Sequence, residues 1–417
     1  MNQPPDQLTP AAPASELDAA AQQQLKHPEA PGILTIDLDA IVANWRLLSS
    51  RAVPAECAAV VKADAYGCGI EPVSRALALA GCKTFFVATL EEAKHVRAVA
   101  PSAAIYVLDG FFSHTGRAYI DLECRPVIGD IGELAEWDAF CRHRGINHGA
   151  ALHIDTGMNR LGLSLAEAQA LLPRIAQGNH GFTLVMSHLV SAEQLDNPIN
   201  GKQLGAFREI ARHFTGISTS LSNSSGIFLG PTFLFDLVRP GAALYGINPT
   251  PEADNPMKEV IDLKVKIVQI RQLERGDHVG YGATWTARRP TRIAIIAAGY
   301  ADGYFRSAGG VDGMRSAEVI INKKRCPIAG RISMDLMAID VTDVPKPPRR
   351  GDFATLIGDG ITVDELARHF GTIGYEVLTS LGRRFARMYK GGNPAAEPVA
   401  PPPAAAEPST PAPATPS

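Results

Sequence analysis

Short apolar runs and amphipathic segments alternate along the first part of the chain. The amphipathic segments carry apolar residues three or four positions apart, as Val73, Leu77 and Ala80 do, and they indicate helices. Between them lie eight runs of strand length, at 58–63, 84–88, 104–108, 125–128, 150–155, 182–188, 218–222 and 237–241. Strands that alternate with helices over roughly 200 residues predict an α/β fold, the (β/α)8 TIM barrel. An open doubly wound sheet is the alternative, but no Gly-x-Gly-x-x-Gly sequence follows the first strand.

The pattern changes after the barrel region. Stretches such as LKVKIVQI, TRIAIIAAGY, AEVIINKKRCPIAG and MAIDVTDV alternate polar with apolar residues or are rich in β-branched residues, with Gly and Pro between them. They predict a C-terminal, mostly-β domain over residues 260–392, after a barrel over 32–259. One helix is expected in this domain, because Thr362 and Glu365 have the spacing of a capping box ahead of an apolar run.

The two ends of the chain differ from the rest in composition. Residues 1–31 are rich in Pro, Ala and Gln, and residues 393–417 are rich in Pro and Ala. Neither segment has enough apolar residues to offset the entropy of ordering the chain, so we expect both to be disordered. The first segment also lacks the basic and apolar regions of a secretory signal peptide. We expect neither end to carry the chemistry.

The composition narrows the classes of function. The chain has 417 residues and a formal net charge of −3, which gives no electrostatic reason to expect nucleic acid or an anionic membrane as a partner. No apolar run is long enough to span a bilayer. The six cysteines form no Cys-x-x-Cys pair and are typical of free thiols in a reducing compartment. We therefore expect a cytoplasmic protein that binds small molecules and has no metal site.

Lys62 stands out at the end of the first apolar run. Burial disfavours the ammonium form of a lysine, and a lysine with a lowered pKa becomes a nucleophilic amine that forms Schiff bases. Tyr66 follows one turn later, and Gly67 and Gly69 permit close approach of the backbone to a bound molecule. The alternative is a lysine that merely extends its charged end into solvent.

Polar residues also follow other strands of the predicted barrel. The active sites of barrel enzymes lie at the carboxyl ends of the strands, and phosphate commonly binds after the seventh and eighth. Each polar residue alone has an ordinary structural explanation, but five strand ends of this kind favour a common site. A lysine and a phosphate site in one barrel suggest pyridoxal phosphate held as a Schiff base. The residues at these ends are Lys62, Asp155, Asn159, Arg160, Ser187, His188, Asn223, Ser224, Ser225, Arg239 and Gly241.

Several segments together resemble one known family. In order along the chain they are AVVKADAYGCG, IDTGMNRLG, SHL, SNSSG, VRPGAALYG, VGYGATW, GYADGY, GRISMD and GYEVLTSLGRR. Over nearly all of residues 33–390 the chain is similar to the alanine racemases, the fold-type III pyridoxal phosphate enzymes. Each segment alone is a modest signal, whereas the whole series in order is highly specific.

The resemblance implies roles for particular residues. Lys62 would be the Schiff-base lysine and one of two catalytic bases. Tyr281, in the mostly-β domain, would be the second base and would reach the active site of a partner subunit, which implies a homodimer with shared sites. Arg239 would bind the pyridine nitrogen of the cofactor. The phosphate ligands or their immediate neighbours would be Tyr66, Ser224, Gly241 and Tyr375.

Other residues resemble those around the substrate. Arg160 would lie near the phenolic oxygen of the cofactor and the substrate carboxylate, and Met334 would supply a backbone amide there. His188 would lie on the cofactor side and orient the second base. Tyr300, with Tyr375, would form a wall that limits the pocket to a small side chain, and Asp335 would support the site or its entrance. The resemblance thus implies alanine as the substrate and D-alanine for cell-wall peptidoglycan as the product.

Two positions depart from the family pattern. Many members have a carbamylated lysine where this chain has His153, and a histidine cannot carry such a carbamate. Arg160 would then be oriented by another acceptor or by an anion. Ser220 stands where a histidine often contacts the arginine at the cofactor ring. Neither change affects a proposed base.

Three alternatives remain open. A broad-specificity amino-acid racemase would share the fold and both bases and differ only in the walls of the pocket. A barrel-type pyridoxal phosphate decarboxylase would ordinarily place an acidic group, not Arg239, at the ring nitrogen. A non-enzymatic pyridoxal phosphate-binding protein would resemble the barrel alone and would lack the domain that carries Tyr281.

Overall fold

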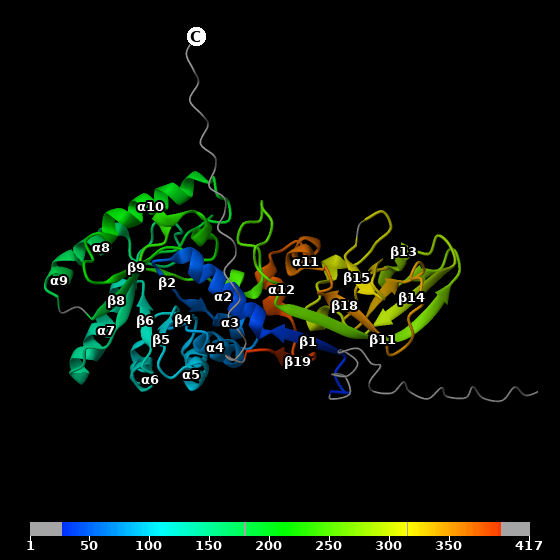
Figure 1. Ribbon diagram of the computed structural model, residues 1–417, viewed down its shortest axis with the longest axis horizontal. Helices are drawn as coiled ribbons and strands as arrows, with labels where there is room; N and C mark the ends of the chain where they lie inside the picture. The colour runs from blue at the N-terminus through cyan, green and yellow to red at the C-terminus, as the bar shows by residue number, and fades with distance from the viewer. Residues whose placement is uncertain (1–26, 179–180, 315, 393–417) are drawn as a thin grey trace, which may run out of the picture.

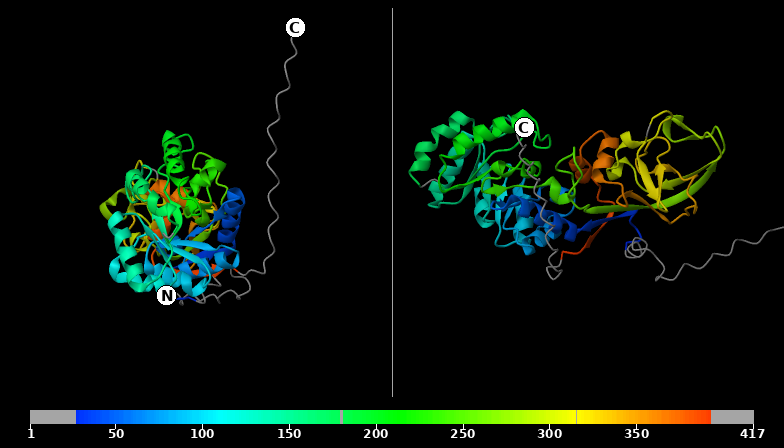
Figure 2. Two further views of the ribbon diagram at one scale, coloured as in Figure 1. Left: turned by 90° about the vertical axis from the view of Figure 1, so that its left-hand side faces the viewer. Right: turned by 45° about the horizontal axis from the view of Figure 1, so that its top comes forward.

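The computed structural model describes residues 27–178, 181–314 and 316–392, which form two parts that lie end to end along the long axis of the molecule (Figure 1). A barrel lies at one end and a β-rich domain at the other, and two further views show the same arrangement (Figure 2). Apart from residues 27–31, the leader and tail expected to be disordered lie outside the described residues.

A ring of parallel strands forms the barrel. Strands β3 to β9 pair in sequence order, and β10 pairs in parallel with β2. The backbone N–H of Arg239 donates to the carbonyl of Ser222 at 2.9 Å, which joins β10 to the chain that leaves β9. Ala58 donates to Val238 at 3.0 Å and closes the ring, so the predicted barrel is confirmed. The strands are β2 (Glu56–Cys57), β3 (Ala59–Val60), β4 (Thr84–Val87), β5 (Ala104–Val107), β6 (Arg125–Ile128), β7 (Ala150–His153), β8 (Phe182–Met186), β9 (Ser218–Ser220) and β10 (Leu237–Val238).

Helices surround the barrel, and several of them begin at a side-chain cap. The carboxylate of Asp130 accepts from the N–H groups of Gly132 and Glu133 at the start of α7, and Gly145 ends the helix with φ of 65°. The helices are α2 (Leu38–Ala52), α3 (Lys62–Tyr66), α4 (Ile70–Leu79), α5 (Leu90–Val99), α6 (Gly116–Asp121), α7 (Ile131–Arg144), α8 (Leu165–Ala170), α9 (Leu172–Ala176) and α10 (Pro198–Ala211). Short 3-10 turns include η2 (Ser113–Thr115), η3 (Ser225–Phe228), η4 (Pro231–Phe233) and η5 (Ala242–Tyr245).

The β-rich domain is built around one long strand, β11 (Ile261–Leu273). The sheet order is β16-β15-β18-β11-β1-β19, and β14 pairs with both β11 and β17. The other strands are β1 (Gly32–Asp37), β12 (His278–Val279), β13 (Trp285–Thr286), β14 (Thr291–Ile296), β15 (Glu318–Ile321), β16 (Lys324–Pro327), β17 (Met337–Asp340), β18 (Phe353–Ile357) and β19 (Ala386–Lys390). The domain also contains η6 (Tyr281–Ala283), η7 (Tyr300–Asp302), η8 (Arg306–Ala308), α11 (Val363–Phe370) and α12 (Gly374–Ser380).

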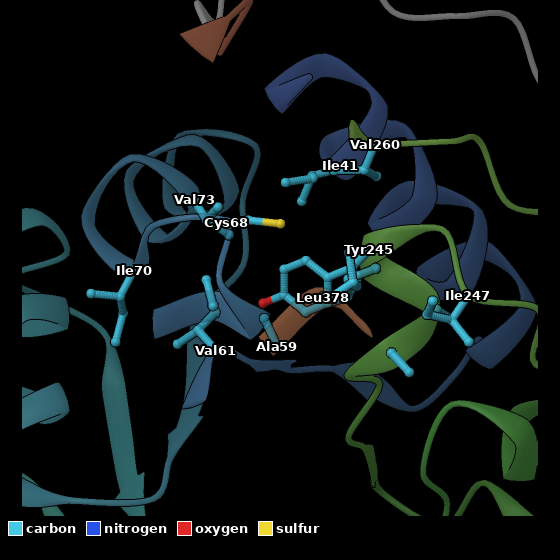
Figure 3. Close-up of a cluster of buried hydrophobic side chains, with 14 of the residues drawn as sticks. Ile41, Ala59, Val61, Cys68, Ile70, Val73, Tyr245, Ile247, Val260 and Leu378 are labelled. Carbon is cyan, nitrogen blue, oxygen red and sulfur yellow. The ribbon is translucent and has the colours of Figure 1, made fainter. Parts of the chain in front are cut away.

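Buried side chains pack on both sides of the barrel wall. Inside the ring, Phe86 stacks on Tyr106 with ring centroids 5.0 Å apart. Outside it, a larger core lies between strands and helices and continues into the β-rich domain. Figure 3 shows Tyr245 of η5, Ile41 of α2 and Leu378 of α12 in one buried cluster. Because α12 belongs to the β-rich domain and Leu378 packs in this cluster, the core connects the second domain to the barrel.

The structure differs from the sequence-based expectation at three places. β1 was assigned to the barrel, but it pairs antiparallel with β11 and parallel with β19 in the other domain. No strand was predicted for this segment, and both strands that pair with it are more than two hundred positions away in the sequence. Thr362 caps α11 by accepting from the N–H of Glu365, while the Glu365 side chain pairs with Arg325 instead of completing the capping box. The domain also has a second helix, α12, which begins after Ile373 without a side-chain cap.

In the described part of the chain, no helix is both long enough and apolar enough to cross a membrane.

Candidate active site

A cavity of about 700 Å³ lies at the carboxyl ends of the barrel strands. α12 of the β-rich domain forms part of its wall, through Tyr375 and Thr379. Most of the residues predicted to form the site line this one cavity: Lys62, Tyr66, Arg160, His188, Ser224, Arg239, Gly241 and Tyr375. The structure thus brings together side chains that lie up to three hundred positions apart in the sequence.

Lys62 enters the cavity directly after β3, where it begins the short helix α3. Burial lowers the pKa of its ammonium group, and the positive charge of Arg160 lowers it further, while Glu92 and Asp109 act in the opposite direction. The net direction favours the neutral amine, which is the form that attacks a carbonyl carbon. The interpretation of Lys62 as a lysine that merely reaches solvent does not fit this position.

A cup of hydroxyl and backbone N–H groups lies on one side of the cavity. The hydroxyl of Ser224 accepts from the N–H of Gly241 at 3.0 Å and of Ala243 at 3.2 Å. Because the Ser224 oxygen accepts from both N–H groups, its own proton points elsewhere and is available to an anion in the cavity. The Tyr66 ring stacks on Tyr245, with centroids 4.6 Å apart, and meets Tyr375 edge-on. Burial raises the pKa of Tyr66, so its hydroxyl stays protonated and can donate to an anion.

Gly241 brings the backbone of this cup close to Tyr66. A Cβ atom at position 241 would overlap the Tyr66 hydroxyl and lie 3.2 Å from the ring carbon that carries it. The close approach to Tyr66 therefore favours glycine at this position, whose φ of −123° lies outside the left-handed region. A small anionic group bound in the cup would contact both the Gly241 backbone and the Tyr66 hydroxyl.

Arg239 lies deeper in the cavity, and its side chain is almost completely buried. Its guanidinium donates to the hydroxyl of Ser220 and to the carbonyl of Ser187, the latter at 2.6 Å. Burial lowers the pKa of Arg239 to about 9, which still leaves the group charged at neutral pH. Among the described residues no carboxylate forms an ion pair with it. Ser220 therefore makes the contact with Arg239 that a histidine at this position often makes in the family.

Two histidines lie near these cations and remain neutral. Burial, and then the charge of Arg239, lower the pKa of His153 to about 4 and the pKa of His188 to about 3. His153 therefore adds no positive charge beside Arg160 at neutral pH, and neither of its protonation states can serve as a counter-ion for that guanidinium. Within the described ranges, no hydrogen bond or ion pair fixes the Arg160 guanidinium, which is exposed at the mouth of the cavity. Arg160 is thus available to the carboxylate of a small substrate.

The residues present fit pyridoxal phosphate. Lys62 offers an amine to an aldehyde carbon, the cup at Ser224 and Gly241 offers hydroxyl and backbone donors to a phosphate, and Arg239 offers a buried donor to a ring nitrogen. The positive charges inside the cavity also match the negative charge of such a cofactor and of an amino-acid carboxylate.

Four predicted site residues lie outside this cavity. Tyr281, Tyr300, Met334 and Asp335 are in the β-rich domain, and Tyr281 is 69% exposed at the start of η6. The strand β13, which follows η6 in the sequence, lies in the part of the molecule far from the barrel (Figure 1). Three of them are adjacent, since Tyr300 donates its N–H to the carbonyl of Ser333, the residue before Met334. These residues form a second surface, separate from the cavity of their own chain.

Other residues of the site were not singled out from the sequence. Glu193 and Glu376 line the outer part of the cavity. Glu92 accepts from the backbone next to Lys62. The signal for Glu92 is its spacing from Thr89, a capping box that places a helix start just after the second barrel strand. No comparable signal marks the other two glutamates.

A barrel that carries a candidate Schiff-base lysine and an anion cup, joined to a β-rich domain, is typical of one class of pyridoxal phosphate enzymes. Comparison with known proteins identifies the family within this class. The model of the alanine racemase N-terminal domain matches residues 36–249, and that of the alanine racemase C-terminal domain matches residues 260–389. The chain therefore belongs to the alanine racemase family.

Individual relatives agree with this family. The chain is 51% identical over 357 residues to an alanine racemase of Methylobacterium sp. (strain 4-46), covering 85% of this chain and 97% of the relative. It is 43% identical to a biosynthetic alanine racemase of Agrobacterium fabrum, covering 92% and 98%. A solved structure of alanine racemase from Bartonella henselae with covalently bound pyridoxal phosphate has a TM-score of 0.82 and 38% identity, over 87% of this chain and 100% of that one.

Proposed function

We propose that this protein interconverts L- and D-alanine with pyridoxal phosphate as its cofactor. The observation that carries the proposal is the single cavity that joins Lys62, the cup at Ser224 and Gly241, and Arg239. When bound, pyridoxal phosphate withdraws electrons from the substrate Cα and makes its proton acidic enough to be removed. The residues of the chain hold the cofactor and supply the proton acceptors.

Lys62 holds the cofactor through its amine and acts as the base on one face of the substrate. Both tasks need a neutral amine, and burial together with Arg160 lowers the pKa of Lys62 in that direction. Arg160, whose guanidinium no other side chain holds in the described part of the chain, binds the substrate carboxylate. A bound carboxylate would in turn reduce the effect of Arg160 on Lys62 and favour the protonated amine that returns a proton to Cα.

Arg239 determines the protonation state of the cofactor's ring nitrogen. A guanidinium does not serve as a proton donor in the acid-base sense, so an arginine at this position leaves the ring nitrogen unprotonated. The ring then stabilises negative charge less strongly, which favours rapid return of a proton to Cα over decarboxylation. This feature argues against the alternative of a decarboxylase, which would place an acidic group at the same position.

The second base is Tyr281 of a partner subunit in a homodimer. The support is that Tyr281, Tyr300, Met334 and Leu336 expose large apolar areas on the β-rich domain, while Ile373 is 59% exposed beside the mouth of the cavity. Exposed apolar groups of this size mark surfaces that bind another molecule. In the dimer, Tyr300 and Asp335 would complete the wall and the entrance of the partner's cavity, and His188 would orient the tyrosine.

Mixed dimers test this arrangement. Lys62→Ala and Tyr281→Phe chains are each expected to be nearly inactive, and a dimer of one chain of each kind would contain one intact site if Tyr281 acts in trans. Random mixing in equal amounts should restore about a quarter of the wild-type activity, as half the dimers are mixed and each has one working site. If mixing restores nothing although mixed dimers form, Tyr281 does not act across the interface.

The substrate is a small amino acid. Tyr375 narrows the cavity from α12, and Tyr300 of the partner would narrow it from the other side. A panel of L-amino acids assayed for D-product distinguishes an alanine racemase from a broad-specificity racemase. Comparable turnover of lysine or arginine would favour the broad-specificity alternative.

The proposal also includes the cellular compartment of the enzyme and the use of its product. We infer that it supplies D-alanine for peptidoglycan in the cytoplasm, supported by the name of the Agrobacterium relative and by six cysteines that are all free thiols. Expression of the chain should allow a strain that requires D-alanine to grow without it. Growth that still needs D-alanine, despite active enzyme in the extract, would contradict this setting.

The central experiment combines spectroscopy with an assay. Purified protein reconstituted with pyridoxal phosphate should show the absorbance of lysine-bound cofactor and racemise alanine, and Lys62→Ala should lose both. The proposal fails if Lys62→Ala keeps the absorbance and the activity of the wild type.

A further inference from the structure

The backbone after Lys62 adopts an unusual conformation. Ala63, Asp64, Ala65 and Tyr66 have φ values of 52–54°, so four consecutive L-residues form a left-handed turn. This region is unfavourable for residues other than glycine because the Cβ approaches the following carbonyl oxygen. Such a turn persists only where surrounding contacts hold it, and strained backbone of this kind concentrates at functional sites.

The turn links two groups of the proposed active site. Lys62 precedes its first residue, and Tyr66, which helps to form the anion cup, is its last. The amine would bind the aldehyde carbon of the cofactor and the phenol hydroxyl would bind its phosphate, so the shape of the turn sets the spacing between the two contacts. A change in the turn would therefore disturb cofactor binding even with both side chains intact.

Glu92 is the side chain that holds the start of this turn. Its Oε1 accepts from the N–H of Ala63 at 2.7 Å, and this N–H belongs to the peptide bond that follows Lys62. Its Oε2 accepts from the N–H of Ala88 at 2.7 Å and of Thr89 at 3.3 Å, at the end of the neighbouring strand β4. A single carboxylate thus joins the ends of β3 and β4, with α3 and α5 beside each other (Figure 1).

We infer that Glu92 is a positioning residue of the active site, whose carboxylate fixes the left-handed turn that directs Lys62 and Tyr66 toward the cofactor. The inference rests on the proposed function and deepens it by naming the residue that sets this spacing. Charge-assisted hydrogen bonds from backbone N–H groups to a carboxylate are about twice as strong as neutral ones, so this carboxylate is suited to hold strained backbone. The same negative charge also acts on the Lys62 amine.

The chain contains a matched control for this role. Glu133 occupies the third position of α7, as Glu92 does in α5, and its carboxylate accepts from Phe111 at 2.5 Å and from Gly129 at 2.8 Å. It therefore joins two loop segments by the same kind of contact, but neither segment carries Lys62 or Tyr66. Glu91 serves as a surface control, since it is exposed and pairs only with Lys94.

The experiment measures cofactor affinity and stability on the full chain. Pyridoxal phosphate is titrated into four apoproteins: the wild type, Glu92→Gln, Glu133→Gln and Glu91→Gln. The Kd of each is obtained from the absorbance of the lysine-bound cofactor. Glu92→Gln should weaken binding by about tenfold or more, a range typical of residues that orient ligand-binding groups, and the two controls by less than about twofold. The apoprotein Tm of Glu92→Gln should fall by about as much as that of Glu133→Gln, because each loses one clamp.

Several outcomes would overturn the inference. Unchanged affinity in Glu92→Gln overturns it, and so does an equal loss of affinity in Glu133→Gln, which would reveal only general loosening of the barrel. If Glu92→Gln does not fold, Glu92→Asp replaces it, because its shorter side chain keeps the charge but cannot reach both β3 and β4; it should still weaken binding. If the wild type binds no pyridoxal phosphate, both the proposed function and the inference fail. If the wild type binds the cofactor and Glu92→Gln binds it equally well, only the inference fails.

Discussion

Substitution of Gly241 by alanine tests the close approach on which the anion cup depends. The new Cβ would overlap the Tyr66 hydroxyl, and that oxygen would have to move by about 1 Å to restore ordinary contact. Tyr66 has little freedom to do so, because Tyr245 stacks on one face of its ring and Tyr375 meets it from another side. The hydroxyl would therefore leave its place in the cup or the Gly241 backbone would shift.

The size of the effect follows from this overlap. Overpacking by one methyl group in a tight interior costs about 1–3 kcal/mol, and a loss of about 2 kcal/mol in binding corresponds to about a 30-fold rise in Kd. We expect Gly241→Ala to raise the Kd for pyridoxal phosphate by about this factor, while the apoprotein stays folded. The measurement is the same absorbance titration, with the Tm of the apoprotein as the check on folding.

A double-mutant cycle decides whether the overlap is the cause. Tyr66→Phe removes the hydroxyl that the new methyl group would meet and leaves the nearest ring carbon 3.2 Å away, which a small shift accommodates. Alanine at position 241 should therefore weaken binding much less in the Tyr66→Phe background than in the wild type. If the two substitutions are additive, the close approach between Gly241 and Tyr66 is not what limits this site.

Three further predictions concern the surroundings of the cavity. Arg384→Ala removes the bidentate partner of the buried carboxylate of Asp302 and should lower the free energy of unfolding by about 2 kcal/mol, measured by urea denaturation. Acidification should destabilise the apoprotein through His153, whose pKa falls from about 6.5 in the unfolded chain to about 4 in the fold. The unfolded chain binds the proton first, so stability falls as the pH drops below about 6.5, and His153→Gln should lose about 2–3 kcal/mol less than the wild type between pH 6.5 and 4.5. Ser220→Ala leaves a buried donor of Arg239 without its acceptor and should weaken cofactor binding by about tenfold, measured by absorbance titration.

Each of these predictions has a control at an exposed residue of the same type. Arg383→Ala, at the exposed neighbour of Arg384, should leave stability unchanged. His143→Gln, on the exposed end of α7, should not alter the pH dependence, and Ser218→Ala, exposed in β9, should not alter cofactor affinity. Equal effects in a control and its test variant would contradict the assigned contact.

Much of the barrel was predictable because its physical causes are local. Most of the strands are short apolar runs, the helices between them have apolar faces, and the alternation of the two limits the chain to few topologies. The order of segments such as AVVKADAYGCG and SNSSG also indicated which strand ends carry the site. Parallel strands place their carboxyl ends on one side, so Lys62, Ser224 and Arg239 could be expected in one cavity without knowledge of any distance.

Other features depend on contacts between distant parts of the chain. β1 joins the second sheet because β11 and β19 cover both of its edges, and neither lies near it in sequence. α12 closes the cavity although its sequence carries no cap, since burial of Leu378 against the barrel holds it in place. Tyr281 does not line the cavity of its own chain, in keeping with the role in a partner's site that the resemblance implied.

The sequence by itself determined the alternating barrel, the second β-rich part, and the lysine and polar groups at the strand ends. These follow from periodicity and residue type, which act over a few neighbouring positions. Only the tertiary structure decided that Glu92 reaches the peptide after Lys62, that Tyr66 meets Gly241, and that Ser220 receives Arg239. Hydrogen bonds and close contacts of this kind depend on separations of a few ångströms between segments far apart in the chain, and only the packed fold sets those separations.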